Sequence, residues 1–192
     1  MSAIRTPICT IVAGPNGVGK STFAAKYLPD RNNFINADEI AKALEERRGR
    51  NVKAARIFLE RVKKHKERLE NFAIESTLSG TRYLNLISDL LKEGWQIDLY
   101  YLWIPNAEVS VDRVSDRVAL GGHDIPKADI IRRYPRSVYN FVHCYMPLCA
   151  TTTCIDNSGE EPTIIFTKKG NGEADILQRE TYNLLRRIVK NE

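Results

Sequence analysis

Short apolar runs alternate with longer segments of helical periodicity along the chain. The runs are rich in β-branched and aromatic residues, which is typical of buried parallel strands. The strongest of them is the eight-residue run 97–104, which ends before Pro105. These runs predict strands at residues 8–13, 34–36, 72–74, 97–104 and 151–155, with a further edge strand at 163–167.

The segments between the apolar runs predict helices. Gly49 separates two of them, and Gly94 suits the position after a helix end. Pro135 is expected to kink or interrupt its helix, because proline has no backbone N–H to donate. The expected helices are one that ends near 27, then 37–46, 52–70, 82–92, 107–120, one that starts near 126, and 174–189. Strands that alternate with helices predict a three-layer α/β fold around a mostly parallel sheet.

Length and composition are those of an ordinary soluble globular protein. The 192 residues are 43% hydrophobic and 28% charged, which predicts a single domain over residues 1–192. No apolar stretch is long enough for a transmembrane helix, and residues 1–5 lead into the first strand without a separate apolar signal region. We therefore expect a cytoplasmic protein that makes no membrane contact.

The four cysteines and the basic charge carry less information. No two cysteines form a C-x-x-C pair, so buried, reduced thiols are expected instead of a zinc site. The net charge of +5 comes mainly from residues 45–70, which hold ten Lys or Arg and five Glu. This segment predicts a solvated helix face with i,i+4 ion pairs, and attraction of a nucleic acid is the alternative.

A phosphate-binding loop lies directly after the first predicted strand. Residues 14–21 match the pattern G-x-x-x-x-G-K-[ST] without a mismatch and open a helix. Backbone N–H groups of such a loop surround the phosphates of ATP or GTP, Lys20 reaches the β- and γ-phosphates, and the Ser21 hydroxyl binds Mg²⁺. The expected nucleotide-binding residues are Gly14, Pro15, Asn16, Gly17, Val18, Gly19, Lys20, Ser21 and Thr22.

Two acidic residues follow predicted strands at the edge where α/β proteins bind ligands. Asp38 comes just after the second strand, and it is interpreted either as a base that accepts a proton from an acceptor hydroxyl or as a helix N-cap. A contact with Mg²⁺ is also open to it. Glu75 ends the third strand, where it contacts metal or substrate, or is a buried acid satisfied by loop N–H groups.

Several cations are expected to form a helical lid over about 106–145. Arg113 and Arg117 share one helix face, and the flexible pair at 121–122 separates them from a second Arg-bearing helix. Such a lid would bring positive charge to the γ-phosphate and exclude water. The second helix carries Arg132, Arg133 and Arg136, and His123 is a candidate for contact with substrate or phosphate. The alternative for the arginines is pairing with Asp112, Asp116, Asp124 and Asp129.

Four segments together resemble the zeta toxin family, in its short single-domain bacterial branch. They are residues 13–24, 36–41, 75–80 and 117–137, and the similarity extends over about residues 6–160. The resemblance implies a P-loop kinase fold that uses ATP or GTP with Mg²⁺. It also implies phosphorylation of a hydroxyl on a UDP-activated amino sugar such as UDP-N-acetylglucosamine, and inhibition by a separate antitoxin protein.

The resemblance also implies residue roles. Asp38 takes the position of the general base, Glu75 and Thr77 contact substrate, and Arg117 matches the first lid arginine. The second lid arginine of the family falls on His123, so either Arg132 or Arg133 of the next helix is expected to replace it, or His123 performs a weaker version of its role. We therefore expect catalysis by Asp38, Lys20 and Arg117, and substrate contacts by Glu75, Thr77, His123, Arg133, Arg136 and Arg113. A polynucleotide end kinase and a nucleotide-binding switch without transfer are the alternatives.

Overall fold

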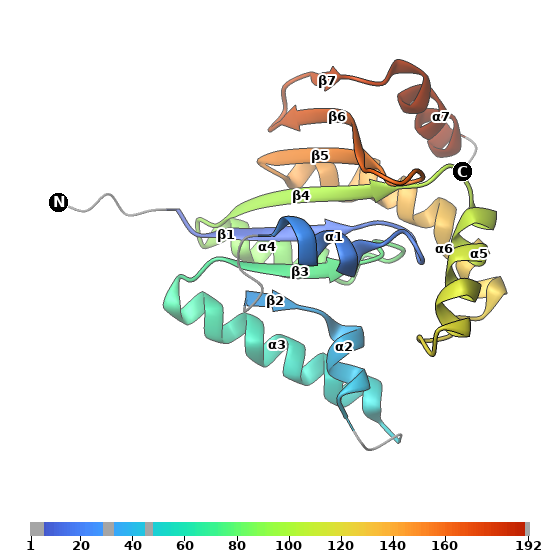
Figure 1. Ribbon diagram of the computed structural model, residues 1–192. Coiled ribbons are helices and arrows are strands. Elements are labelled where there is room, and N and C mark those ends of the chain that lie inside the picture. The colour runs from blue at the N-terminus through green and yellow to red at the C-terminus, as the bar shows by residue number, and fades with distance from the viewer. Residues whose placement is uncertain (1–5, 29–32, 45–47, 191–192) are drawn as a thin grey trace.

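A seven-stranded sheet forms the centre of the protein (Figure 1). The computed structural model describes residues 6–28, 33–44 and 48–190. The strand order is β2-β3-β1-β4-β5-β6-β7. The strands are β1 (Ile8–Ala13), β2 (Phe34–Ile35), β3 (Phe72–Ser76), β4 (Gln96–Trp103), β5 (Thr151–Asp156), β6 (Thr163–Lys169) and β7 (Ala174–Ile176).

The first five strands of the chain run parallel, and the last two run antiparallel to their neighbours. The prediction of a mostly parallel sheet is therefore confirmed. The prediction that residues 163–167 form an edge strand is wrong, because β7 pairs with the outer side of β6. Residues 174–176, expected to begin the last helix, form this strand instead, and the helix starts at Arg179.

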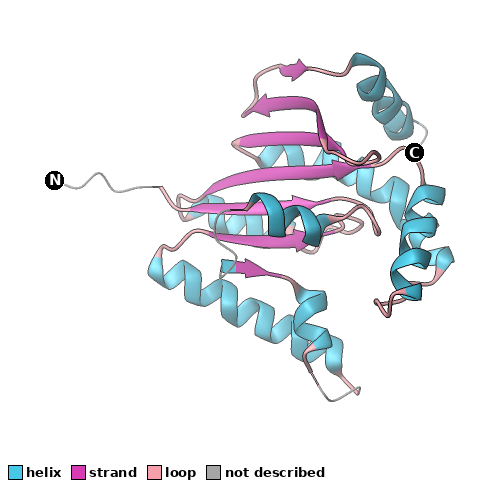
Figure 2. Cartoon of the chain, in the orientation of Figure 1, coloured by secondary structure: helices cyan, strands magenta, loops and turns pink. Residues whose placement is uncertain are grey.

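Helices cover both faces of the sheet (Figure 2). In Figure 1, α1 lies in front of the strands, whereas α4 and α6 lie behind them. The helices are α1 (Lys20–Tyr27), α2 (Ala37–Lys42), α3 (Arg50–Arg68), α4 (Leu84–Lys92), α5 (Ala107–Ala119), α6 (Lys127–Asn140) and α7 (Arg179–Lys190). The prediction of a helix over 37–46 reaches past α2, and its residues 45 and 46 lie outside the described part. The three-layer α/β architecture agrees with the prediction.

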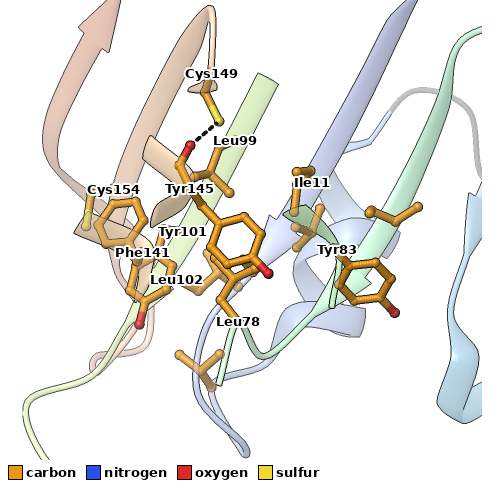
Figure 3. Packing of buried hydrophobic residues seen from close by; sticks show 14 of the residues in the cluster. Ile11, Leu78, Tyr83, Leu99, Tyr101, Leu102, Phe141, Tyr145, Cys149 and Cys154 are labelled. Carbon is orange, nitrogen blue, oxygen red and sulfur yellow. Dashed lines mark hydrogen bonds between the residues drawn. The ribbon is translucent and has the colours of Figure 1, made fainter. Parts of the chain in front are cut away.

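Pro135 does not interrupt α6, which continues to Asn140 and then passes into a π-helical turn, Phe141–Tyr145. Tertiary packing explains this, because Ile130, Tyr134 and Val138 are buried on one side of the helix. The ring of Phe141 stacks on Tyr101 of β4 at 3.9 Å between centroids (Figure 3). The packed face therefore holds the helix where its local sequence would favour a break.

The cysteines are free thiols, as expected; Cys9, Cys149 and Cys154 are buried and Cys144 is half-buried. Burial raises the pKa of the Cys149 thiol to about 12, so this group stays protonated and donates to the Tyr145 carbonyl at 3.2 Å (Figure 3).

The basic helix α3 carries the expected i,i+4 pairs. Arg56 lies 3.1 Å from Glu60, and Lys63 lies 3.7 Å from Glu67. Residues 45–47, the start of the basic segment, lie outside the described part. Among the helices that the structure describes, none is long and apolar enough to cross a membrane.

Candidate active site

The phosphate loop connects β1 to α1 at the carboxyl edge of the sheet (Figure 1). Gly14, Gly17 and Gly19 have φ angles of 143°, 74° and 90°, a region that side chains with a Cβ rarely adopt. A Cβ on Gly14 would also overlap the Leu102 carbonyl oxygen of β4. The loop therefore needs glycine both for its conformation and for its contact with the neighbouring strand.

Gly17 occupies a variable position of the motif, yet the structure leaves no room for a side chain there. A Cβ there would lie 2.8 Å from the Ser110 carbonyl oxygen and 3.3 Å from the Arg113 Cβ, both on α5. The base of α5 thus packs directly against the phosphate loop. This contact was not predictable from the motif, because it joins segments about 90 residues apart.

The start of α1 leaves backbone donors for an anion. The first intrahelical bond runs from the Phe23 N–H to the Gly19 carbonyl at 2.9 Å. The N–H groups of Lys20, Ser21 and Thr22 have no backbone acceptor within the described residues. A helix N-terminus with unpaired N–H groups suits a phosphate, and the first turn of α1 carries no competing acid.

Lys20 is buried inside the loop. Its Nζ donates to the carbonyl oxygens of Gly14 and Pro15 at 3.0 and 2.9 Å, and lies 4.0 Å from Glu75 Oε1. Burial lowers the pKa of the Lys20 ammonium, and the carboxylates of Glu75 and Asp38 partly counteract this. The loop therefore holds a desolvated cation whose attraction for a phosphate is weakly screened.

Glu75 joins the phosphate loop to the neighbouring strands. Its Oε2 accepts hydrogen bonds from the Ser21 hydroxyl at 2.8 Å and from Asn36 Nδ2 at 2.9 Å. Because the Ser21 proton points at Glu75, the lone pairs of Ser21 remain for another ligand. A hydroxyl beside a carboxylate is a set of hard oxygen donors, which fits Mg²⁺.

Asn36 is the N-cap of α2, and sequence reasoning missed it. Its Oδ1 accepts from the N–H groups of Asp38 and Glu39 at 2.8 and 3.3 Å. The alternative that Asp38 caps this helix is therefore wrong, and the Asp38 carboxylate is not used for capping. Asn and Asp are about equally favoured as caps, so the local sequence does not decide between them.

One cavity of about 950 Å³ brings most of the expected site residues together. Its lining includes residues of the loop, of α2, of β3 and the loop after it, and of the predicted lid, namely Asn16, Gly17, Lys20, Ser21, Asp38, Glu75, Thr77, Arg117, His123, Arg132, Arg133 and Arg136. Lys42, Arg50 and Arg82 also line it, from α2, α3 and the segment before α4. Sequence reasoning missed Lys42 and Arg82 and included Arg50 only as part of the basic segment 45–70, because nothing in their spacing relates the three cations.

Arg113 does not belong to the cavity lining, contrary to the expectation that it contacts substrate. Its guanidinium donates to the carbonyl oxygens of Asn157 and Ser158 at 2.7 and 2.8 Å. Asn157 Nδ2 in turn donates to the Val18 carbonyl at 2.6 Å. Arg113 therefore holds the segment after β5, and this segment in turn holds the phosphate loop through the bond from Asn157 to Val18.

Arg117 is held by the turn that follows α5. Its Nη2 donates to the His123 carbonyl oxygen at 2.6 Å, and the Gly122 N–H donates to the Arg117 carbonyl at 2.8 Å. The buried Nε of Arg117 has no hydrogen-bond partner within the described residues. The Arg117 side chain nevertheless lines the cavity, where a guanidinium is expected to meet an anion.

Gly122 keeps Arg117 in this position, and for the phosphoryl transfer that the sequence predicts, its replacement is expected to lower kcat by about tenfold or more. A Cβ on Gly122 would overlap the Arg117 side chain at Cγ and lie 2.7 Å from the Arg117 carbonyl oxygen. We expect Gly122→Ala to lower kcat with little change in ATP affinity, measured by initial rates and nucleotide titration. Gly159→Ala is the matched control, because a Cβ there meets nothing within 4 Å. Equal kcat values for the two variants would refute this role.

The lid arginines are partly paired, as the alternative for them predicts. Asp129 accepts from Arg132 at 2.6 Å and from Arg133 at 3.4 Å. The hydrogen bond from Arg132 is the main cause that lowers the pKa of the Asp129 carboxyl. Both arginines nevertheless line the cavity.

The loop after β3 is fastened to the second lid helix. The carbonyl oxygens of Thr77, Leu78 and Gly80 accept from side chains on α6 and its π-helical turn, namely Ser137 at 2.5 Å, Asn140 at 2.7 Å and Tyr145 at 2.8 Å. Buried Leu78 has a φ of 52°, a strained conformation that these bonds support. Thr77 thus lines the cavity from a loop that is held in place by hydrogen bonds to α6 and its π-helical turn.

Comparison with known proteins supports the fold. No family model matches the chain. An uncharacterized protein of Haemophilus influenzae is 30% identical over 127 residues, which are 63% of this chain and 88% of that protein. A chain of the AvrRxo1-ORF1:-ORF2 complex with ATP has a TM-score of 0.72 and 15% identity. That match covers 98% of this chain and 65% of the other, so this chain spans less than two thirds of its length.

The PezAT chromosomal toxin-antitoxin system of Streptococcus pneumoniae gives a TM-score of 0.51 at 12% identity, with 97% of this chain and 87% of the other covered. At these identities the similarities establish the fold. The expectation of an α/β P-loop kinase fold is confirmed.

Proposed function

We propose that the chain, which belongs to the same protein family as the Haemophilus influenzae relative, is a kinase, because it has the P-loop kinase fold. It transfers the γ-phosphoryl group of ATP or GTP to an alcohol group of an acceptor. One observation supports this above all: Lys20 of the phosphate loop, Asp38 of α2 and Arg117 of the lid line the same cavity. A nucleotide-binding switch without transfer would not need Asp38 beside the phosphate loop.

The nucleotide phosphates lie on the loop and on the start of α1, where Lys20 and the unpaired N–H groups bind them. Ser21 would hold Mg²⁺, and Glu75 orients the Ser21 hydroxyl by accepting a hydrogen bond from it. When bound, Mg²⁺ neutralises part of the charge on the phosphates. The lid cation Arg117, which lines the cavity, meets the γ-phosphate through its guanidinium group.

Asp38 is the general base of the proposed reaction. The acceptor oxygen bonds to the γ-phosphorus, and the bond from that phosphorus to the β–γ bridging oxygen breaks. The hydroxyl proton passes to the Asp38 carboxylate, and the nucleoside diphosphate leaves. Charge on the transferred group is stabilised by Lys20, by Arg117 and by a second lid residue from among His123, Arg132, Arg133 and Arg136.

The cations on the acceptor side favour an acceptor that carries phosphate. Lys42, Arg50 and Arg82 line the cavity, and within the described residues none of them has a carboxylate partner. Farther along α3, Arg56, Lys63, Lys66 and Arg68 are paired, whereas Arg61 and Lys64 have no carboxylate partner within the described residues, so the place of the three cations on the cavity wall is what carries the argument. A UDP-activated amino sugar, the substrate implied by the resemblance to zeta toxins, has a diphosphate that such cations would bind. The phosphates of a polynucleotide end fit them too, which makes a polynucleotide kinase the second candidate.

A separate inhibitory protein is a further part of the proposal. The AvrRxo1 and PezAT structures are named as two-component assemblies, the latter a toxin–antitoxin system. An antitoxin that covers the nucleotide cavity would prevent transfer, as the resemblance to zeta toxins implies. A cytoplasmic location, where nucleotide and acceptor are available, belongs to the same proposal.

Transfer of radiolabelled γ-phosphate from Mg²⁺·ATP tests this function. The acceptors are UDP-N-acetylglucosamine, N-acetylglucosamine as its neutral counterpart, an oligonucleotide with a 5′-hydroxyl, and none. We expect label on the UDP-activated sugar and little on the neutral sugar. Label on the oligonucleotide alone would establish the second candidate, and nucleotide binding without transfer to any acceptor would refute both.

A further inference from the structure

Asn36 connects the two acidic residues of the proposed site, Glu75 and Asp38. It is only 6% exposed and lies between β2 and α2, directly before the helix that carries Asp38. Its Nδ2 donates to Glu75 Oε2 at 2.9 Å, and its Oδ1 accepts from the Asp38 N–H at 2.8 Å. One side chain therefore contacts the residue that orients Ser21 and the backbone of the proposed base.

The orientation of this amide is fixed by chemistry. A carboxylate only accepts hydrogen bonds, and a backbone N–H only donates them. The NH₂ group of Asn36 must therefore face Glu75, and its oxygen must face the start of α2. Strand pairing sets the spacing, because Ile35 of β2 lies opposite Ile74 of β3, which places the following residues Asn36 and Glu75 side by side.

Two donors converge on a single oxygen of Glu75. Ser21 Oγ lies 2.8 Å and Asn36 Nδ2 lies 2.9 Å from Oε2, whereas Oε1 faces Lys20 at 4.0 Å. Asn36 thus fixes the rotation of the carboxylate that accepts the hydrogen bond from the Ser21 hydroxyl. Without the hydrogen bond from Asn36, the Glu75 carboxylate could rotate away from Ser21. The Ser21 hydroxyl would then lose the orientation that Mg²⁺ binding needs.

We propose that Asn36 is a positioning residue that sets the Mg²⁺-binding hydroxyl of Ser21, through Glu75, and the Asp38 base in one geometry. This inference rests on the proposed kinase function. It goes beyond helix capping, because capping uses only the Asn36 oxygen. The NH₂ group of Asn36 is the part that acts on Glu75.

Two substitutions separate positioning from capping. Asn36→Asp keeps a favoured N-cap but places a carboxylate against Glu75, whereas Asn36→Ser keeps a cap and leaves Glu75 without this donor. We expect kcat to fall by about 10- to 100-fold in Asn36→Ser. We expect a larger fall in Asn36→Asp, measured at pH 8, well above ordinary carboxyl pKa values. Asn106→Asp is the matched control, because Asn106 is exposed and, within the described residues, its side chain forms a hydrogen bond only through the oxygen that caps α5.

The affinity for ATP, measured with Mg²⁺ and with EDTA, gives a readout that does not depend on transfer. In the wild type, Mg²⁺ is expected to tighten ATP binding, and both Asn36 variants should lose most of that gain while binding ATP normally in EDTA. A variant Asn36→Asp that is as active as Asn36→Ser, or an unchanged gain from Mg²⁺, would overturn the inference. If the wild type transferred no phosphate, the proposed function would fail, but the binding comparison would still decide the role of Asn36.

Discussion

Replacing Lys20 with methionine is expected to lower phosphoryl transfer by at least about 100-fold and to weaken ATP binding. Lys20 is the buried cation of the loop, and its Nζ lies 3.0 and 2.9 Å from two loop carbonyl oxygens. Phosphate oxygens carry more negative charge than carbonyls and are stronger acceptors for an ammonium. Methionine has a similar length without the charge, so the variant removes the attraction and keeps most of the side-chain volume.

Initial rates with Mg²⁺·ATP and titration with a fluorescent nucleotide test this prediction. Lys26→Met is the control on the same helix, because the Lys26 side chain is 57% exposed and its partner Glu161 is 76% exposed. We expect the control to retain wild-type rates, since exposed pairs contribute little. Thermal unfolding of both variants shows whether the fold is intact. Transfer by Lys20→Met within tenfold of the wild type would contradict the role of Lys20.

Most of the fold could be predicted because its signals are local. The parallel strands are short apolar runs, and the phosphate loop is a contiguous motif between a strand and a helix. The errors lie where tertiary contacts outweigh local preference. Residues 174–176 are helical in pattern but pair with β6, and α6 passes through Pro135 because its buried face is packed.

The site was predictable only in part, because its geometry depends on contacts between distant segments. Asp38 and Glu75 were identified from their positions after strands, and both line the cavity. Their link through Asn36 depends on the pairing of β2 with β3, which the sequence does not display. The sequence places Arg113 and Arg117 on one helix face, one turn apart. In the structure, Arg113 binds the segment after β5, whereas Arg117 lines the cavity.

The hypothesis of a kinase with Asp38 as its base and the hypothesis of a nucleotide-binding switch differ most in what they predict for replacement of Asp38. Asp38→Asn is expected to lower kcat by about 10²- to 10⁴-fold, because amide nitrogen and oxygen are poor proton acceptors while the size of the side chain is unchanged. The helix N-terminus should remain intact, since Asn36 supplies the cap. We expect the affinity for Mg²⁺·ATP to stay within about threefold of the wild type, because the proposed role concerns the acceptor proton and not the phosphates.

Glu39→Gln is the matched control for this variant. Glu39 is the next residue of α2, also lies in its first turn and also lines the cavity, so the two substitutions remove equal charge from nearly the same place. If general electrostatics caused the loss, both variants would lose activity alike. If Asp38 is the base, only Asp38→Asn falls by orders of magnitude in single-turnover transfer, while Glu39→Gln changes by a few-fold. A protein that binds ATP equally well in all three forms and transfers phosphate in none would be a switch, and full activity of Asp38→Asn would assign the proton to another acceptor.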